Sequence, residues 1–152
     1  MGAGRLVSKW MPVIVWMVLI FAGSTDALSA EHTSRFLVPF LHWLYPTISF
    51  QMIVAIHFTL RKIGHFTEYA ILATLLWRAW RGSFTAMTKW TLAFGVFLVT
   101  ATFAASDEFH QSFVPTRTAS AHDVMIDCIG AFVAVAICLI FADKRISQAA
   151  TS

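Results

Sequence analysis

Hydrophobic residues along the chain gather into four long runs separated by short polar or charged stretches. The runs cover about residues 10–23, 63–80, 90–105 and 124–141. An α-helix needs about 20 apolar residues to cross a bilayer, and lipid leaves the exposed backbone groups of other open structures unsatisfied. The pattern therefore predicts an all-α fold. We expect a polytopic membrane helix bundle with about four transmembrane helices, forming a single integral membrane domain over residues 1–152.

The stretch between the first two runs, residues 36–60, is too aromatic for a free loop, and Pro39 and Pro46 are expected to interrupt it. Its aromatic residues are Phe36, Phe40, Trp43, Tyr45, Phe50 and Phe58. Because amphipathic rings favour the membrane interface, we predict one or two short interfacial helices here. A fifth, broken span over residues 48–60 is the alternative.

The first run has a second interpretation as a cleavable signal peptide. Arg5 and Lys9 precede its apolar centre, and Ala27-Leu28-Ser29 follows it. In either case the segment that comes next lies outside the cytoplasm.

Basic residues in the connecting stretches predict the orientation, because cytoplasmic loops are enriched in Lys and Arg. With four crossings, one side of the membrane receives Arg5, Lys9, Arg78, Arg81, Lys89, Lys144 and Arg145. The other side receives Arg35, Arg61, Lys62 and Arg117. The majority places both termini in the cytoplasm, and residues 25–62 and 106–123 face outward.

Composition excludes several classes of protein. Hydrophobic residues make up 58% of the chain and charged residues 12%, which excludes a water-soluble globule. The 11 basic residues are scattered between apolar runs and form no continuous patch, so nucleic acid is not an expected partner. Cys128 and Cys138 lie on one predicted helix about 15 Å apart, which is too far for a disulfide.

Ionisable residues within the apolar runs are the strongest indication of function, because they are costly in lipid. They form stripes at the outer ends of three runs. The second run carries Lys62, His65, Glu68 and Tyr69. The third carries Asp107, His110 and Gln111, with Glu108 turned about 100° away. The fourth carries Asp123, Asp127 and Gly130.

We expect these stripes to meet in one polar pocket that opens outward. It would join five of the eight acids with Lys62, Arg117, His65 and His110. Carboxylates crowded in a low dielectric should hold protons, bind a cation or pair with the bases.

Several of these residues also have simpler roles. Ser120 and Asp123 fit a helix capping box, which does not exclude a second role for Asp123. Lys62 and Arg61 could extend to lipid head groups. Gly130 is expected to permit close helix packing.

Structural pairing is the simpler role for Glu68 and Asp127, and solvation of a helix end is that for Glu108 and His110. The residues with suitable metal-ligand chemistry are His65, Glu68, Asp107 and His110. Their spacing on separate helices is unspecific, so we predict no metal site.

Three motifs in this order resemble the signature of the VanZ-like family of small bacterial integral membrane proteins. They are Lys62-x-x-His65-x-x-Glu68-Tyr69, Asp107-Glu108-x-His110-Gln111-x-Phe113-x-Pro115-x-Arg117 and Asp123-x-x-x-Asp127-x-x-Gly130. The resemblance covers about residues 62–141. It implies a location in the bacterial inner membrane and a role in the cell envelope. The family takes its name from a protein implicated in resistance to the glycopeptide teicoplanin.

The resemblance also implies a set of functional residues. These are Lys62, His65, Glu68, Tyr69, Asp107, Glu108, Gln111, Arg117, Asp123 and Asp127. Thr118 stands where the family often has glycine, and Asp127 stands where asparagine is common. The added negative charge of Asp127 slightly favours cation or proton binding.

The first functional hypothesis is a site that binds or modifies an anionic envelope substrate, such as a lipid-linked or cell-wall precursor. Lys62 and Arg117 would hold phosphate. The general acids and bases would come from Glu68, Asp107, Glu108, His65 and His110, and the remaining binding residues would be Tyr69, Gln111, Asp123 and Asp127. No nucleophile elbow, zinc motif or phosphate-binding glycine loop is present, so enzyme status stays open and no cofactor is identified.

Two other hypotheses use the same residues. The carboxylates could serve a proton- or cation-coupled transporter, although four spans without an inverted repeat are few unless the protein forms an oligomer. The stripes could instead hold together a non-catalytic membrane assembly factor. Membrane lipids are expected partners in every case.

Overall fold

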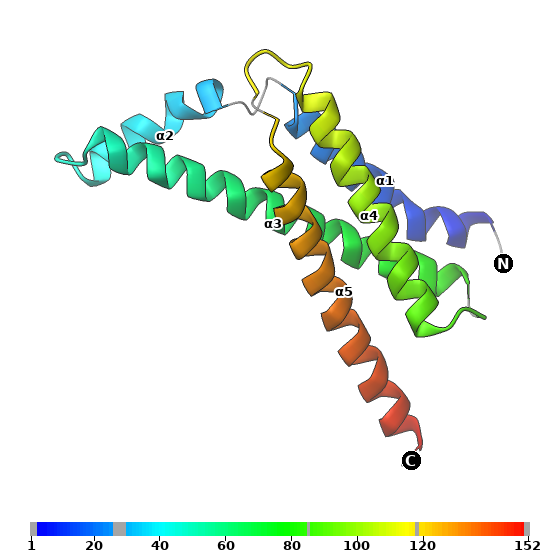
Figure 1. The fold of residues 1–152 in the computed structure, drawn as a ribbon. Helices are drawn as coiled ribbons and strands as arrows, with labels where there is room; N and C mark the ends of the chain where they lie inside the picture. The colour runs from blue at the N-terminus through cyan, green and yellow to red at the C-terminus, as the bar shows by residue number, and fades with distance from the viewer. Residues whose placement is uncertain (1–2, 26–29, 85, 118, 151–152) are drawn as a thin grey trace.

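Five α-helices make up most of the part of the chain that the structure describes (Figure 1). This computed structural model covers residues 3–25, 30–84, 86–117 and 119–150, without the side chains of residues 3, 5, 30–32 and 143–150. The helices are α1 (Ala3–Gly23), α2 (Ala30–Leu44), α3 (Phe50–Ser83), α4 (Lys89–Gln111) and α5 (Ala121–Ala150). No strand occurs within the covered ranges, so the predicted all-α fold is confirmed.

Three of these helices are long and apolar enough to cross a membrane. The qualifying segments are Leu6–Gly23 in α1, Lys89–Gln111 in α4 and Ala121–Ala142 in α5. The remaining expected span, residues 63–80, lies within α3. Because α3 carries a stripe of polar residues, it does not qualify by hydropathy, although its length is ample. A bundle of about four spanning helices is compatible with this arrangement.

The segment between the first two apolar runs differs from the expectation in two respects. Pro39 does not interrupt it: α2 continues through this residue. Because proline has no amide hydrogen, the helix lacks one intrahelical hydrogen bond there. Pro46 does lie in the turn between helices, and Ser49 then caps α3 by accepting a hydrogen bond from the Met52 amide at 3.3 Å.

The helix that holds the expected span 63–80 begins at residue 50 instead. No proline or glycine occurs between Ser49 and Gly64, so α3, once capped, continues unbroken from Phe50 to Ser83. Neither a second separate short helix nor a broken span forms over residues 48–60. At 1.5 Å per residue α3 is about 51 Å long, well above the roughly 30 Å of a bilayer's hydrocarbon core.

Helix α3 is the centre of the fold and contacts all four other helices. The start of α3 pairs with α2 and extends away from the bundle, while α1, α4 and α5 pack along the rest of it, from about residue 61 onward (Figure 1). A hydrogen bond of 2.8 Å between Thr33 and His57 joins α2 to α3.

Helix α1 runs antiparallel to α3. The Trp10 indole donates to the Ser83 hydroxyl at 3.1 Å, Lys9 donates to the Gly82 carbonyl, and further along Trp16 donates to the Glu68 carbonyl at 2.9 Å. One end of the bundle therefore joins the start of α1, the end of α3 and the start of α4. We call it the basic end, because Lys9, Arg81 and Lys89 lie there.

Some predictions from the sequence concern residues that the structure does not describe. Residues 27–29, the cleavage site of the signal-peptide interpretation, are not covered. The side chains of Arg5, Lys144 and Arg145, which contributed to the predicted orientation, are not covered either.

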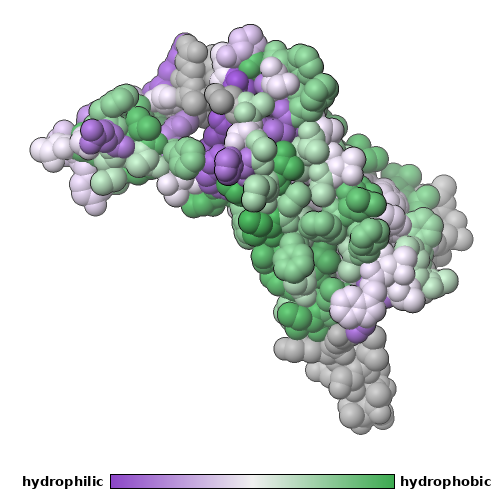
Figure 2. All heavy atoms as spheres, in the orientation of Figure 1, coloured by the Kyte–Doolittle hydropathy of each residue, from purple (hydrophilic) through white to green (hydrophobic). Residues whose placement is uncertain are grey.

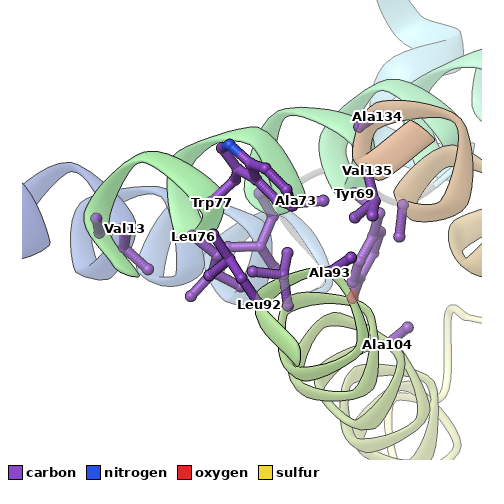
Figure 3. Close-up of a cluster of buried hydrophobic side chains, with 14 of the residues drawn as sticks. Val13, Tyr69, Ala73, Leu76, Trp77, Leu92, Ala93, Ala104, Ala134 and Val135 are labelled. Carbon is purple, nitrogen blue, oxygen red and sulfur yellow. The ribbon is translucent and has the colours of Figure 1, made fainter. Parts of the chain in front are cut away.

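Most of the buried apolar side chains form one cluster between α1, α3, α4 and α5 (Figure 3), and Leu41 and Ile53 are buried apart from it. It combines larger residues of α3, such as Leu72 and Trp77, with small ones on the partner helices, including Ala93 and Ala131. Small residues allow close helix approach in membranes, where lipid supplies no hydrophobic force between helices.

The closest described approach at a glycine is between α3 and α5. A Cβ atom on Gly130 would lie 2.3 Å from the Phe66 carbonyl oxygen, so the two backbones are in direct contact there. This contact accounts for the glycine, as the sequence predicted.

Candidate functional site

The polar stripes of α3 and α5 face each other at the end of the bundle opposite the basic end. Lys62 donates to the Asp123 carboxylate, and Nδ1 of His65 lies 3.1 Å from Oδ1 of Asp127. Nε2 of His65 also lies 3.8 Å from Oδ2 of Asp123. Both aspartates are 1% exposed, so the carboxylates of this layer are buried; Lys62 and Asp123 form an ion pair in it, and we call it the ion-pair layer.

Arg61 links this layer to α4. One guanidinium nitrogen lies 3.6 Å from Oδ2 of Asp123 and 3.4 Å from Oε1 of Gln111. Gln111 in turn donates to Asp107, one turn earlier on α4, at 3.2 Å. The stripes of three separate helices therefore converge. The sequence interpretation gave Arg61 no site role and expected it, like Lys62, to be able to extend to lipid head groups.

A cavity of about 300 Å³ opens beside these residues, between α1, α2, α3 and α4. Its polar lining is Ser24, Thr33, His57, Arg61, His65, Glu68, Asp107, Gln111 and Arg117. Its apolar lining includes Ile20, Leu37 and Leu60. We refer to it as the carboxylate cavity. Hydrophilic residues gather in the same region in Figure 2, near the start of α5, above a mostly hydrophobic face.

Sequence reasoning found about half of this polar lining. It named His65, Glu68, Asp107, Gln111 and Arg117. It missed Thr33 and His57, because α2 and the first half of α3 carry no motif that signals their pairing.

The five acids expected in one chamber are distributed over three places. Glu68 and Asp107 line the carboxylate cavity. Asp123 and Asp127 lie in the ion-pair layer between α3 and α5. Glu108 is buried at the start of α5, apart from the cavity lining. The pairing with bases lowers the cost of burying so many charges.

Glu108 of α4 caps the N-terminus of α5. Its carboxylate accepts a hydrogen bond of 2.5 Å from the Ser120 amide. The expected capping box is not formed, because the Ser120 hydroxyl accepts from the His122 amide and the Asp123 side chain turns to Lys62. Glu108 therefore fixes the position at which α5 enters the bundle.

Tyr69 and His110 lie outside the cavity. The Tyr69 side chain is fully buried, with its ring 6.2 Å from that of Phe103 and its hydroxyl near the Asp107 carboxylate (Figure 3). The His110 ring lies 4.3 Å from that of Phe21 on α1. Both side chains contribute to helix packing at these positions.

Arg117 lines the cavity and fastens the end of α1. Its Nε donates to the Thr25 carbonyl at 3.1 Å, and another guanidinium nitrogen donates to the Gly23 carbonyl. The loop between α4 and α5 is thereby tied to the loop that follows α1. Much of the donor capacity expected for phosphate is used in this way.

Several buried polar atoms of the site have no hydrogen-bond partner. They are Nε of Arg61, the Tyr69 hydroxyl, Oδ1 of Asp107, Oε2 of Glu108 and Nδ1 of His110. An unsatisfied buried group costs about 1–3 kcal/mol, so Arg61 and Asp107, which also line the cavity, would gain from a polar ligand. No group of three or more His, Cys, Asp or Glu residues in the covered ranges is placed to hold a metal ion.

No curated protein and no solved structure matches the sequence. The family model described as VanZ/LLP1 matches residues 9–142. The match begins in α1, well before the motif-bearing region 62–141, and extends through the spanning part of α5. It therefore covers most of the chain, including all of the carboxylate cavity. This chain belongs to the VanZ/LLP1 family.

Proposed function

We propose that this protein is a multi-pass protein of the bacterial inner membrane that binds the phosphate-bearing head group of an amphipathic envelope substrate in the carboxylate cavity. A lipid-linked or cell-wall precursor fits this description. The observation that carries the proposal is the lining of the cavity, where Arg61 and Arg117 lie beside apolar side chains of α1, α2 and α3.

Arg61 is the cation best suited to contact the anion. Its side chain is 22% exposed, its Nε has no hydrogen-bond partner, and its contacts to Asp123 and Gln111 are long, at 3.6 and 3.4 Å. A guanidinium offers several donors in a planar fork, which suits phosphate oxygens. Arg117 would contribute charge more than free donors, since it holds two backbone carbonyls.

The size of the cavity fits a head group and not a whole lipid. A volume of about 300 Å³ is at the lower limit for small-molecule sites. Ile20, Leu37 and Leu60 provide an apolar wall along which an acyl or prenyl chain would leave toward the bilayer.

The direction of the cavity follows from the distribution of charge. The basic end of the bundle, with Lys9, Arg81 and Lys89, would face the cytoplasm under the positive-inside rule. Both termini would then be cytoplasmic, and the carboxylate cavity would face the outside. This side gives access to cell-wall precursors, which is consistent with a contribution to glycopeptide-type resistance.

The same cavity contains groups that could modify a bound substrate. His65 lines it while its Nδ1 contacts Asp127, and a carboxylate partner of this kind orients an imidazole for proton transfer. Glu68 lines the cavity one turn away. We include general acid–base chemistry by His65 and Glu68 as an extension of the binding proposal.

Binding is tested by thermal unfolding of the purified full-length protein in detergent with added polyprenyl phosphate. Wild type should be stabilised, by about 2.7 kcal/mol at a ligand concentration 100 times Kd. Arg61→Gln should weaken binding about tenfold, because one charge-assisted contact is lost. Arg35→Gln is the matched control, because Arg35 is exposed on α2 and does not line the cavity. Equal stabilisation of wild type and Arg61→Gln would overturn the proposal.

A surplus of acids favours a second candidate, a proton- or cation-coupled transporter. The site and its surroundings hold five carboxylates against Arg61, Lys62 and Arg117, and His57 and His65, the two histidines of the cavity lining, would both have to be protonated to balance the charge. Intramembrane acids and histidines serve as proton relays. This candidate requires pH-dependent substrate movement in proteoliposomes, and its absence would remove it.

Glu68→Gln and Asp127→Asn separate a functional site from a purely structural one. In a functional site, both variants should abolish an envelope or resistance phenotype while expression and Tm stay near wild type. If the stripes only support a membrane assembly factor, both variants should lower stability in detergent without a selective loss of phenotype.

A further inference from the structure

A second cavity of about 280 Å³ lies at the basic end of the bundle, far along α3 from the carboxylate cavity. It is formed where α3 ends and α4 begins, which lie side by side in Figure 1, and Ala142 of α5 completes it. Its lining is Trp77, Arg81, Phe84, Met87, Lys89, Leu92 and Ala142. We call it the basic cavity.

The charge of the basic cavity is of one sign. Among the described side chains of its lining, Arg81 and Lys89 carry charge, and both are cationic. Residues 1–25 and 69–106 contain no Asp or Glu, and on α5 the Asp143 that follows Ala142 is itself followed by Lys144 and Arg145, so bases outnumber acids in the sequence around the cavity. Lys9, which donates to the Gly82 carbonyl next to Arg81, adds a further cation at this end.

The backbone adds to the attraction for an anion. Helix α4 spans 23 residues and begins at Lys89, on the rim of the basic cavity. The N-terminus of a helix carries a partial positive charge and unpaired amides. Thr88 already accepts from the Thr91 amide, so only part of this capacity is used within the protein.

The remaining lining is apolar and aromatic. Trp77 and Leu92 are buried members of the main core, while Phe84 is exposed at the rim. A ligand that fits must therefore present an anionic group beside Arg81 and Lys89 and apolar groups beside the rings. A free anion would leave the apolar wall uncovered.

We propose that the basic cavity binds the phosphate of an anionic phospholipid from the membrane leaflet at this end. Basic pockets between membrane helices are suited to such head groups, because the phosphate pairs with Lys and Arg while the acyl chains stay in the bilayer. Lipid bound here would join the α3–α4 connection to α5 at Ala142. This proposal is independent of the substrate suggested for the carboxylate cavity.

The test is native mass spectrometry of the full-length protein titrated with phosphatidylglycerol. All variants are made in the Arg61→Gln background, so that the carboxylate cavity contributes little. Arg81→Gln and Lys89→Gln should each weaken binding about tenfold, since each removes one charge-assisted contact. Arg78→Gln should change it less than twofold, because Arg78 is exposed on α3 and does not line the cavity.

Three outcomes would overturn the proposal. An equal loss in Arg78→Gln would show only diffuse attraction to the basic end. Equal binding of phosphatidylcholine would show no preference for net negative charge. Full competition by millimolar inorganic phosphate would identify a free-anion site instead of a lipid site. Use of both Arg81→Gln and Lys89→Gln guards against a single variant that fails to fold.

Discussion

Replacing Gly130 by alanine should destabilise the protein, although alanine is the better helix former. In a helix interior, glycine to alanine normally stabilises by about 0.5–1 kcal/mol. Here the new Cβ would lie 2.3 Å from the Phe66 carbonyl oxygen and 3.2 Å from its Cα. Because both are backbone atoms, α3 and α5 must separate, by about 1 Å to reach the 3.3 Å of a close C···O contact.

The cost of this separation can be estimated. Overpacking by one methyl group typically costs about 1–3 kcal/mol. The separation would also lengthen the 3.1 Å contact between His65, which precedes Phe66 on α3, and Asp127, which lies one turn before Gly130 on α5, at a further cost of about 1 kcal/mol. After the gain in helix propensity, we expect Gly130→Ala to lose about 1–3 kcal/mol of unfolding free energy.

The assay is reversible unfolding in mixed micelles, followed by tryptophan fluorescence. Gly64→Ala is the matched control, because a Cβ on this α3 glycine meets nothing within 4 Å. It should leave stability unchanged or raise it by up to about 1 kcal/mol. The reasoning fails if Gly130→Ala is as stable as Gly64→Ala, since the close contact of α3 with α5 would then be absent.

Two further predictions concern contacts between helices. Lys62→Met and Asp123→Asn should each destabilise the protein by about 1–2 kcal/mol, which is less than for a fully buried pair because Lys62 is 21% exposed. The double variant should lose less unfolding free energy than the sum of the two single variants. Strict additivity in a double-mutant cycle would refute the pairing. Thr33→Val removes the 2.8 Å hydrogen bond to His57 and should raise amide hydrogen exchange in α2. Thr59→Val is the control and should leave this exchange unchanged, because the Thr59 hydroxyl donates to the Ala55 carbonyl of its own helix. Equal exchange in both variants would contradict the role of Thr33.

The sequence predicted the helices and the composition of the stripes because both depend on local periodicity. A spacing of three or four residues defines a face of one helix, as in Lys62 and His65 or Asp123 and Asp127. The requirement to bury these charges together then made their convergence a reasonable expectation. The close contact at Gly130 was predicted for a similar reason, because only a small residue permits it.

Other parts of the site could not be predicted from local patterns. Arg61 enters because α3 continues outward past Lys62, and periodicity does not indicate how a helix is rotated against its neighbours. Thr33 and His57 meet through a pairing of two helices that no motif marks. Glu108 reaches an amide twelve residues away, across an irregular loop. Tyr69 follows Glu68 in the chain, yet it turns into the apolar core.

The central claim, that the polar edges of α3 and α5 face each other, is tested most directly by cross-linking in native membranes. Cys128 and Cys138 are first replaced by serine, and His65→Cys is combined with Asp127→Cys. A short bifunctional thiol reagent should bridge this pair, because the native side chains are 3.1 Å apart. It should not bridge His65→Cys with Ile129→Cys, because the Ile129 side chain is 53% exposed on α5. Equal bridging of the two pairs, or bridging of the second alone, would contradict the proposed site.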